Sequence, residues 1–293
     1  MENAETVVVG DKIHRPLFDE TLTEEDLRVA RVELNETPEQ REVALRVVKQ
    51  MLNEQTEFMS RTDDVFLLRF LRCKKFDCER TFKTIRDHYK FKQANPKVFP
   101  APSGIEHALR ANIYNFLPHR DHKGRAIYVV KPSRWNLKEV SYNDFVAAGN
   151  LVAEYVLDNA VTQINGFIGI WDYNGFSMQH LFNICSPKRV ILLTTLMQDR
   201  FPARFKVAYC VNCHPLTTTA FNLLGPLLKE KFRNRVKILG SDINEMHKYL
   251  DPAILPPEYN GTMTIPETQQ VTQGLLDKEG YFNYNSKFGY NKF

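Results

Sequence analysis

The alternation of short apolar runs with longer helical patterns constrains the fold of this chain most. Runs with the length and the β-branched or aromatic content of buried strands cover residues 125–131, 167–171 and 206–211. The stretches that follow the first two runs, 141–163 and 186–197, have helical periodicity. Strands joined through helices pair in parallel, because the crossover returns the chain in the same direction. The sequence therefore predicts an α/β fold with a mostly parallel sheet flanked by helices.

A purely helical pattern precedes this region. Thr23 with Asp26 resembles a capping box, and Thr37 before Pro38 places an N-cap ahead of a proline at the first helical position. A proline-rich break then separates the helical pattern from the first strand. We predict a small N-terminal helical lobe at 21–95, a main domain at 100–265 and a C-terminal tail at 266–293.

The two ends of the chain carry weak patterns. Residues 1–20 are polar and are expected to form a loose arm, and the aromatic tail from 278 to 293 lacks a period and is expected to drape over the surface. The first residues lack the apolar run of a signal peptide, and no window reaches about 18 uninterrupted apolar residues. We expect a cytoplasmic protein whose five cysteines are reduced thiols.

Composition and motifs argue against catalysis. The net charge of +4, from 39 basic and 35 acidic residues, is too small to indicate nucleic-acid binding. Cys210 and Cys213 have C-x-x-C spacing, but they follow a predicted strand and lack a second pair. Asp172 and Gly175 form a D-x-x-G string without a phosphate-binding loop. Neither triad nor metal spacing links His119, His122 and His214. We therefore expect neither an enzyme nor a metal or other cofactor.

The segment from Leu216 to Leu228 combines an apolar stripe with a break. Gly225-Pro226 interrupts the helical ladder, because proline lacks a donor and clashes one turn back. A short amphipathic helix with such a weak point is typical of a lid, although a core helix kinked by proline has the same pattern. Its apolar face comprises Leu216, Ala220, Leu223, Leu224 and Leu227. Its polar residues, Thr217, Thr218, Thr219 and Asn222, fall largely opposite.

Five strings in order resemble the CRAL-TRIO family of lipid-binding proteins. They are FLLRFLRCKKFD (66–77), IWDYNGF (170–176), DRFPARFKVAYCVNCHP (199–215), LGPLLKEKFRNRVKILG (224–240) and ILPPEYNG (254–261). The match extends over residues 24–262. The resemblance implies a carrier that binds a tocopherol-, retinoid- or carotenoid-like ligand in an apolar pocket behind a gate helix. It also implies transfer of that ligand between membranes, with phosphoinositide-assisted docking.

The resemblance also implies which residues form the pocket. The wall is expected to include Val146, Gly149, Ala153, Phe167, Trp171, Leu193, Leu196, Met197 and Ala208. Members that carry tocopherol have serines at the positions of Gly149 and Ala153, so this chain departs from them near the ligand's head. Tyr155, Tyr173 and Asn150 are further polar candidates.

A basic surface follows from the same comparison. The positions that bind phosphoinositide in the family correspond here to Lys74, Arg204, Lys206, Lys231 and Arg235, all of them basic. Several cations at one place would bind phosphate groups through charge-assisted hydrogen bonds.

Two alternatives within the family remain open. A phospholipid exchanger of the same fold uses a Glu–Lys pair for an inositol head group, and Cys213 stands at the glutamate position here. A lipid-sensing adaptor would use the tail from 278 to 293 for protein partners that the sequence does not identify.

Overall fold

The computed structural model describes residues 4–263 and 269–290. The side chains left undescribed within those ranges belong to Gln198, Asp199, Leu216, Ala220, Leu223, Leu224, Leu227, Gln269 and Gln270.

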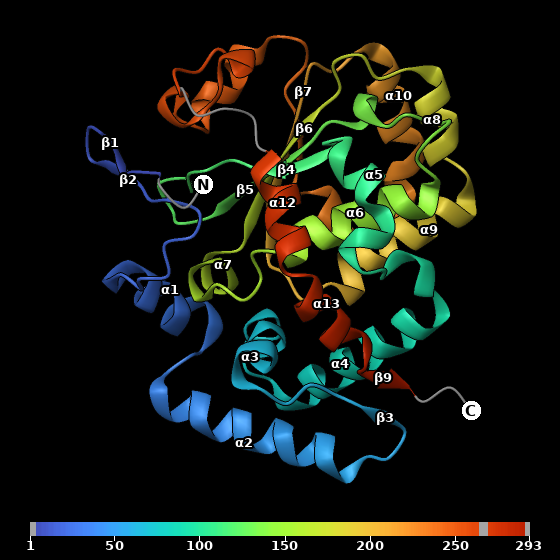
Figure 1. The fold of residues 1–293 in the computed structure, drawn as a ribbon. Coiled ribbons are helices and arrows are strands. Elements are labelled where there is room, and N and C mark those ends of the chain that lie inside the picture. Colours follow the sequence, from blue (N-terminus) through green and yellow to red (C-terminus); the bar gives the residue numbers. More distant parts are fainter. Residues whose placement is uncertain (1–3, 264–268, 291–293) are drawn as a thin grey trace.

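A five-stranded sheet forms the centre of the main domain (Figure 1). Its strands, in spatial order, are β4 (Tyr114–Phe116), β5 (Ala126–Val130), β6 (Phe167–Asp172), β7 (Phe205–Val211) and β8 (Val236–Ile238). Strand β4 pairs antiparallel with β5, and the other three pairings are parallel. The predicted α/β class with a mostly parallel sheet is confirmed.

The helices of this domain differ in detail from the predicted ones. They are α5 (Glu106–Arg110), α6 (Tyr142–Glu154), α7 (Ala160–Asn165), α8 (Met178–Ile184), α9 (Pro187–Thr195), α10 (Pro215–Leu224) and α11 (Glu230–Arg233). The single helix expected over 141–163 is two helices, because the Asn159 side chain accepts a hydrogen bond from the Thr162 amide and caps a new start. Helix α8 was not predicted; it has only seven residues, too few for a clear helical period, and none of them is buried.

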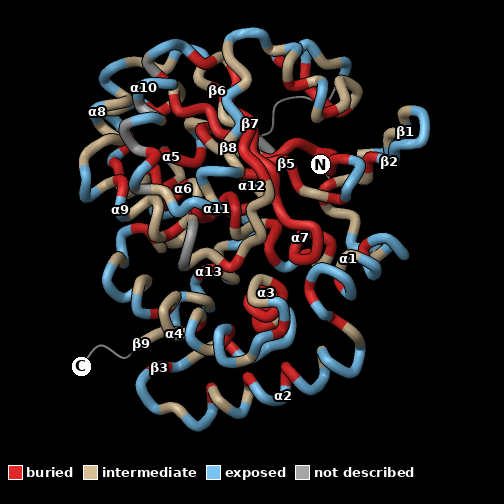
Figure 2. The backbone as a smooth tube through the Cα atoms, turned by 180° about the vertical axis from the view of Figure 1, so that it is seen from behind, coloured by how far each residue is buried: buried red, intermediate tan, exposed pale blue. Residues whose placement is uncertain are grey.

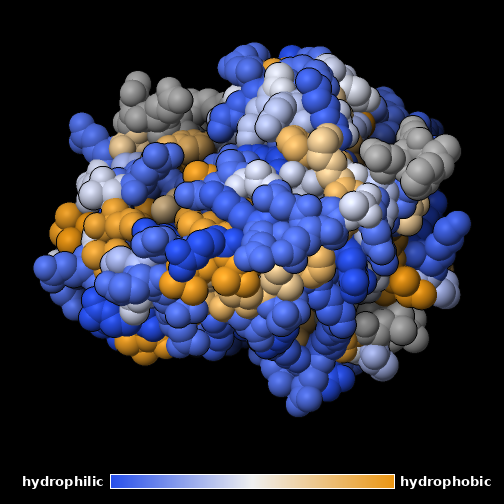
Figure 3. All heavy atoms as spheres, turned by 90° about the horizontal axis from the view of Figure 1, so that it is seen from below, coloured by the Kyte–Doolittle hydropathy of each residue, from blue (hydrophilic) through white to orange (hydrophobic). Residues whose placement is uncertain are grey.

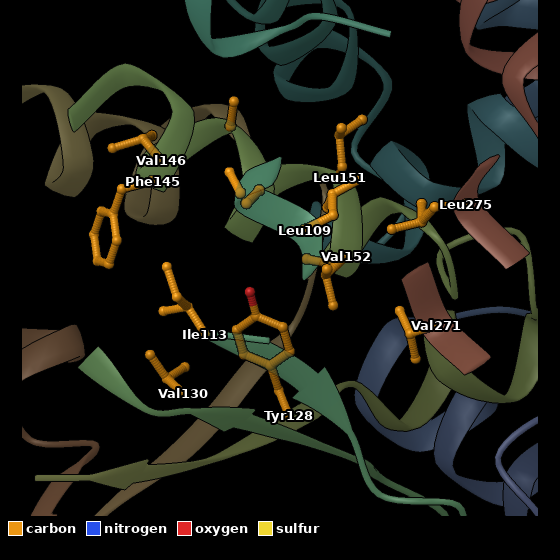
Figure 4. Packing of buried hydrophobic residues seen from close by; sticks show 14 of the residues in the cluster. Leu109, Ile113, Tyr128, Val130, Phe145, Val146, Leu151, Val152, Val271 and Leu275 are labelled. Atoms are coloured by element: carbon orange, nitrogen blue, oxygen red, sulfur yellow. The ribbon is translucent and has the colours of Figure 1, made fainter. Parts of the chain in front are cut away.

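The sheet separates two apolar cores. Along β5, Ala126, Tyr128 and Val130 belong to one core, whereas Ile127 and Val129 belong to the other. This is the period-two alternation of a strand that is buried on both faces. In Figure 4 side chains of β5 and α6 point toward each other on the first face. In Figure 2 the sheet and α7 form the buried centre of the molecule.

The small lobe, predicted to be helical, contains α1 (Glu24–Leu34), α2 (Pro38–Glu54), α3 (Asp64–Cys73) and α4 (Cys78–Ala94). Thr23 and Asp26 form the predicted capping box, and Thr37 caps α2 with Pro38 at its first position. The side of the molecule where α2 lies is mostly hydrophilic, with apolar side chains in separate patches (Figure 3). None of the described helices has the length and hydropathy needed to cross a bilayer.

Both ends of the chain are more ordered than expected. The arm before residue 20 contains a hairpin of β1 (Val7–Val9) and β2 (Lys12–His14). The tail forms α12 (Gln269–Asp277), α13 (Glu279–Ser286) and β9 (Gly289–Tyr290), which pairs with β3 (Phe58–Met59) of the small lobe. The tail therefore packs into the fold rather than draping over it, and Figure 1 shows α12 and α13 extending from the sheet to the small lobe.

Arg69 of α3 joins the lobe, the main domain and the tail. Its guanidinium is fully buried and donates hydrogen bonds to Glu154 at the end of α6, to Asp158 at 2.5 Å and to the Tyr281 hydroxyl at 2.7 Å. Removing one partner of a buried ion pair leaves the other charges without compensation, which is strongly unfavourable.

Arg69→Met should therefore lower the free energy of unfolding by about 3 kcal/mol in urea denaturation. Arg28→Met is the matched control, because Arg28 pairs with Glu25 on the exposed face of α1 and should change stability little. Equal effects of the two substitutions would contradict the proposed role of Arg69.

Candidate functional site

An apolar cavity lies on one face of the sheet, between that face and the helices α6, α8, α9 and α10. It encloses about 230 Å³. None of the described residues that line it carries a charged side chain. An apolar ligand needs few directional contacts, because each methylene removed from water contributes about 0.8 kcal/mol. The cavity is therefore suited to a neutral, mainly hydrophobic molecule.

Eight of the nine predicted wall residues line this cavity. They are Val146, Gly149, Ala153, Phe167, Trp171, Leu193, Leu196 and Met197. Ala208 is fully buried but is not among the lining residues. It pairs with Gly169, and the Trp171 and Phe205 rings lie over Gly169, within 3.0–3.2 Å of where a β-carbon would be. These rings, and not the small residues beneath them, form this part of the wall.

Aromatic side chains form much of the wall, and of these the sequence analysis predicted Phe167 and Trp171 as wall residues and Tyr173 as a polar candidate. Those that were not predicted are Tyr114, Tyr128, Phe145, Phe176, Phe201, Phe205, Phe221 and Phe232. The only signal was compositional, since the chain has 20 phenylalanines. Phe176 follows β6 and Phe221 lies in α10, so only the folded chain brings them together.

Gly149 of α6 allows close contact with Tyr114 of β4. A β-carbon at Gly149 would lie 2.9 Å from Cζ of the Tyr114 ring, closer than carbon atoms approach without displacement. The Tyr128 hydroxyl donates to the Gly149 carbonyl at 2.9 Å. The departure from serine at this position therefore lets a tyrosine ring pack against α6.

Two polar atoms of the lining have no hydrogen-bond partner among the described residues. They are Oδ1 of Asn150, whose residue is 8% exposed, and Nε1 of Trp171. Tyr173, another of the predicted polar candidates, also lines the cavity. Tyr155 does not, because its ring packs against Phe18 and beneath the Lys278 ammonium of the tail.

The predicted gate segment forms one wall of the cavity. The described residues of the segment that line the cavity are not those that were expected to do so. Helix α10 ends at Leu224 and continues as a 3-10 turn over Gly225–Leu227, where Pro226 predicts a break. The five predicted gate side chains, Leu216, Ala220, Leu223, Leu224 and Leu227, lie outside the described residues. Thr217, expected on the polar face, is instead buried and lines the cavity together with Phe221 and Leu228.

The wall that α8 and α9 form carries apolar residues on both sides, although Gln179 and Lys188 are also exposed on the outside. Leu181 and Leu193 face the cavity. On the outside, Phe182 is 70% exposed and Ile191 is 57% exposed. A helix pair with apolar residues on both sides is unusual at a water-facing surface, and it fits contact with an apolar phase such as a bilayer.

The five predicted basic residues belong to one electrostatic cluster, which we call the basic surface: Lys74, Arg204, Lys206, Lys231 and Arg235. Burial, then the positive charges of Arg235 and Lys74, lower the pKa of Lys231. Burial and the charge of Arg204 likewise lower the pKa of Arg235. Mutual repulsion of this kind indicates excess positive charge, which an anion would stabilise.

Two features of the basic surface were not predicted. Arg72, which precedes it in sequence, is buried and pairs with Glu36 at 2.7 Å, so it belongs to the core. Glu33 of α1 lies inside the surface, where its Oε2 atom accepts from Arg204 Nη2 at 2.6 Å and from Lys206 Nζ at 2.8 Å. No sequence pattern connects Glu33 with positions about 170 residues later.

The sequence motifs that resemble catalytic sites lie in surroundings that indicate a structural role for them. Burial raises the pKa of Cys213 to about 11 and that of Cys210 further, which disfavours a reactive thiolate. Asp172 accepts hydrogen bonds from the Asn174 amide and the Asn212 side chain and so closes a turn. Among the residues with described side chains, no three His, Cys, Asp or Glu residues are grouped so as to hold a metal ion.

An α/β domain with an apolar cavity, whose described lining carries no charge, is typical of proteins that bind hydrophobic ligands. The family described as CRAL/TRIO domain matches residues 110–261, and the family described as Pinta-like, UBA domain matches residues 37–101. The chain belongs to the CRAL-TRIO family, whose members are lipid-binding and lipid-transfer proteins rather than enzymes.

Similar proteins cover most of the chain. An alpha-tocopherol transfer protein-like protein of Mus musculus is 33% identical over 89% of this chain and 77% of its own length. Clavesin-1 of Pongo abelii is 33% identical over 83% and 70%, and clavesin-2 of Rattus norvegicus is 31% identical over 88% and 80%. The crystal structure of Sfh5 superposes with a TM-score of 0.52 at 11% identity, over 90% of this chain and 99% of that one, which shows a shared fold.

The contact between Gly149 and Tyr114 predicts an asymmetry between two substitutions. Gly149→Ser should lower the free energy of unfolding by about 1–3 kcal/mol, because the Tyr114 ring must move within a packed wall. Ala153→Ser, one turn later on the same cavity wall, is the matched control and should cost less. Thermal or urea denaturation measures both, and a larger loss for Ala153→Ser would contradict the packing argument.

Proposed function

We propose that this protein extracts a small hydrophobic molecule from one membrane, encloses it, and releases it to another. The observation that carries this proposal is a cavity whose described lining has no charged side chain and whose outer wall, α8 and α9, exposes Phe182 and Ile191 on its solvent side. The apolar side chains of such a wall can contact the ligand in the cavity on one side and the bilayer on the other. A ligand can then pass between the two without crossing bulk water.

The chemistry of the lining favours a neutral terpenoid-like ligand over an enclosed phospholipid. A phospholipid head group carries a charged phosphate, and burying that charge without a cation to pair with it is costly. The described lining offers no such cation. A tocopherol-, retinoid- or carotenoid-like molecule has no charge to neutralise.

Asn150 favours some neutral hydrophobic ligands over others. Asn150 lines the cavity, its buried Oδ1 atom has no partner among the described residues, and leaving such a group unpaired costs about 1–3 kcal/mol. A ligand with a hydroxyl group can donate to this atom. We infer that hydroxylated ligands bind better than their ethers.

Retinol and retinyl methyl ether test this preference by fluorescence titration. The wild type should favour retinol by about tenfold relative to the ratio found for Asn150→Leu, in which the acceptor is absent. Ala153→Val, which narrows the same cavity without changing its polarity, should affect both ligands alike. An unchanged ratio in Asn150→Leu would exclude Asn150 as the acceptor. Failure of the wild type to bind either compound would contradict a carrier of such ligands.

The basic surface supplies a docking contact for anionic membranes. Each basic residue close to an anionic leaflet contributes about 1 kcal/mol. Arg204 and Arg235 also donate to the backbone carbonyls of Ile164 and Phe205, so changing them would disturb the fold as well as the surface. Lys74 and Lys231 are better positions for a test, because they lie at or near the surface.

The double substitution Lys74→Glu and Lys231→Glu should reduce binding to phosphoinositide-containing vesicles at least about tenfold in a flotation assay. It should also slow ligand transfer to those vesicles while ligand binding in solution is unchanged. The double substitution Lys97→Glu and Lys138→Glu, at exposed positions outside the basic surface, makes the same change in net charge and serves as the control. Transfer that persists at the wild-type rate in the double variant would exclude docking through this surface.

We further propose that docking and release are coupled through α10. The chain between Gly225 and Leu227, where the helix is interrupted, leads directly to Lys231 and Arg235 of the basic surface. A membrane bound at those residues can displace α10 with little disruption of the rest of the fold.

A further inference from the structure

Glu33 lies between two cations of the basic surface, Arg204 and Lys206. A single carboxylate oxygen, Oε2, accepts hydrogen bonds from Arg204 Nη2 at 2.6 Å and from Lys206 Nζ at 2.8 Å. A phosphate oxygen held by the same two donors would take the same position. The carboxylate is therefore an intramolecular stand-in for the anion that the surface binds.

This carboxylate remains ionised at neutral pH. Burial acts to raise its pKa, but hydrogen bonds from Lys206 and Arg204 and their positive charges outweigh burial, and the pKa is lowered from its ordinary value. Glu33 therefore competes with an incoming anion as a charged group. About half of its side chain is accessible to solvent, at 45%, so an exchange requires no unfolding.

The outcome of the exchange depends on the charge of the competitor. A monoanion such as a phosphodiester or a carboxylate of a lipid head group replaces one negative charge by another and gains little. A phosphomonoester carries about −1.5 to −2 charges at pH 7 and offers three acceptor oxygens, so it gains additional attraction from both cations. Glu33 thus raises the charge that a ligand must carry in order to bind.

We propose that Glu33 makes the Arg204–Lys206 pair a binding subsite selective for the phosphomonoester group of a membrane lipid. The other cations of the basic surface, which carry no such internal carboxylate in the described contacts, attract anionic membranes in general. Selection among anionic lipids then takes place where Glu33 must be displaced. This inference rests on the proposed docking function and adds to it a subsite and its ligand chemistry.

Glu33 also links two parts of the molecule. It belongs to α1 of the small lobe, whereas Arg204 and Lys206 lie at the start of β7. Exchange of the carboxylate for a lipid phosphate therefore releases one contact between the lobe and the sheet at the moment of docking.

Vesicle binding by Glu33→Gln tests the proposal. Two vesicle types are compared, one containing phosphatidylinositol 4-phosphate and one containing phosphatidylserine, matched in total surface charge. We expect the wild type to prefer the phosphatidylinositol 4-phosphate vesicles. Glu33→Gln should increase binding to the phosphatidylserine vesicles by about fivefold and the other binding by less, so that the preference shrinks.

Glu25→Gln is the matched control, because Glu25 lies on the same helix and pairs with Arg28 at 2.6 Å, away from the subsite. It should leave the preference unchanged. Inorganic phosphate added to the wild type should compete only weakly, since a free anion lacks the remaining membrane contacts. Competition strong enough for inorganic phosphate to release the protein from the vesicles would show a site for soluble phosphate. That result would overturn the assignment to a membrane lipid.

Two further results would overturn the inference while leaving the docking proposal intact. One is an equal increase in binding of Glu33→Gln to both vesicle types, which would show that Glu33 acts only through net charge. The other is no change at all. If neither the wild type nor the variant binds any anionic vesicle, the docking proposal itself fails and this inference fails with it.

Discussion

The hydrogen bond from the Tyr128 hydroxyl to the Gly149 carbonyl sets the distance between the sheet and α6. A tyrosine that spans from β5 to the helix, together with the Tyr114 ring that packs against Gly149, acts as a spacer between the two layers. Close-packed interiors leave few voids larger than a water molecule. A cavity of about 230 Å³ persists here because rigid rings support its walls.

The two faces of the sheet therefore differ in packing. On the face away from the cavity, Ile127, Val129 and Tyr209 pack with the chain that follows β8 in an apolar core. On the other face, α8, α9 and α10 close the space without filling it. A core on one side thus supports a wall on the other in which α8 and α9 contribute few buried residues, so that separating these two helices from the sheet would lose less packing.

Charged side chains are also distributed unevenly between the cavity and the surface of the molecule. The cavity has no charged lining among its described residues, whereas cations gather where the small lobe meets the edge of the sheet. Arg69 is buried with acidic partners and holds the lobe in place, and Arg204 and Lys206 share Glu33 at the surface. Arginine therefore forms a buried ion pair that stabilises the interior and, with lysine, forms the proposed anion subsite at the surface.

Local periodicity, the caps Thr23 and Thr37, and strings in a fixed order were sufficient to predict the fold class, the capped helices of the small lobe and the family. The resemblance to that family also indicated most of the cavity wall. The aromatic rings that complete the wall, the inward-facing Thr217 and the covered Ala208 became apparent only in the folded chain. The approach of Glu33 to Arg204, of Tyr114 to Gly149 and of the tail to Arg69 joins positions far apart in the chain. Such contacts depend on how whole elements pack in space, and no local pattern of residues encodes them.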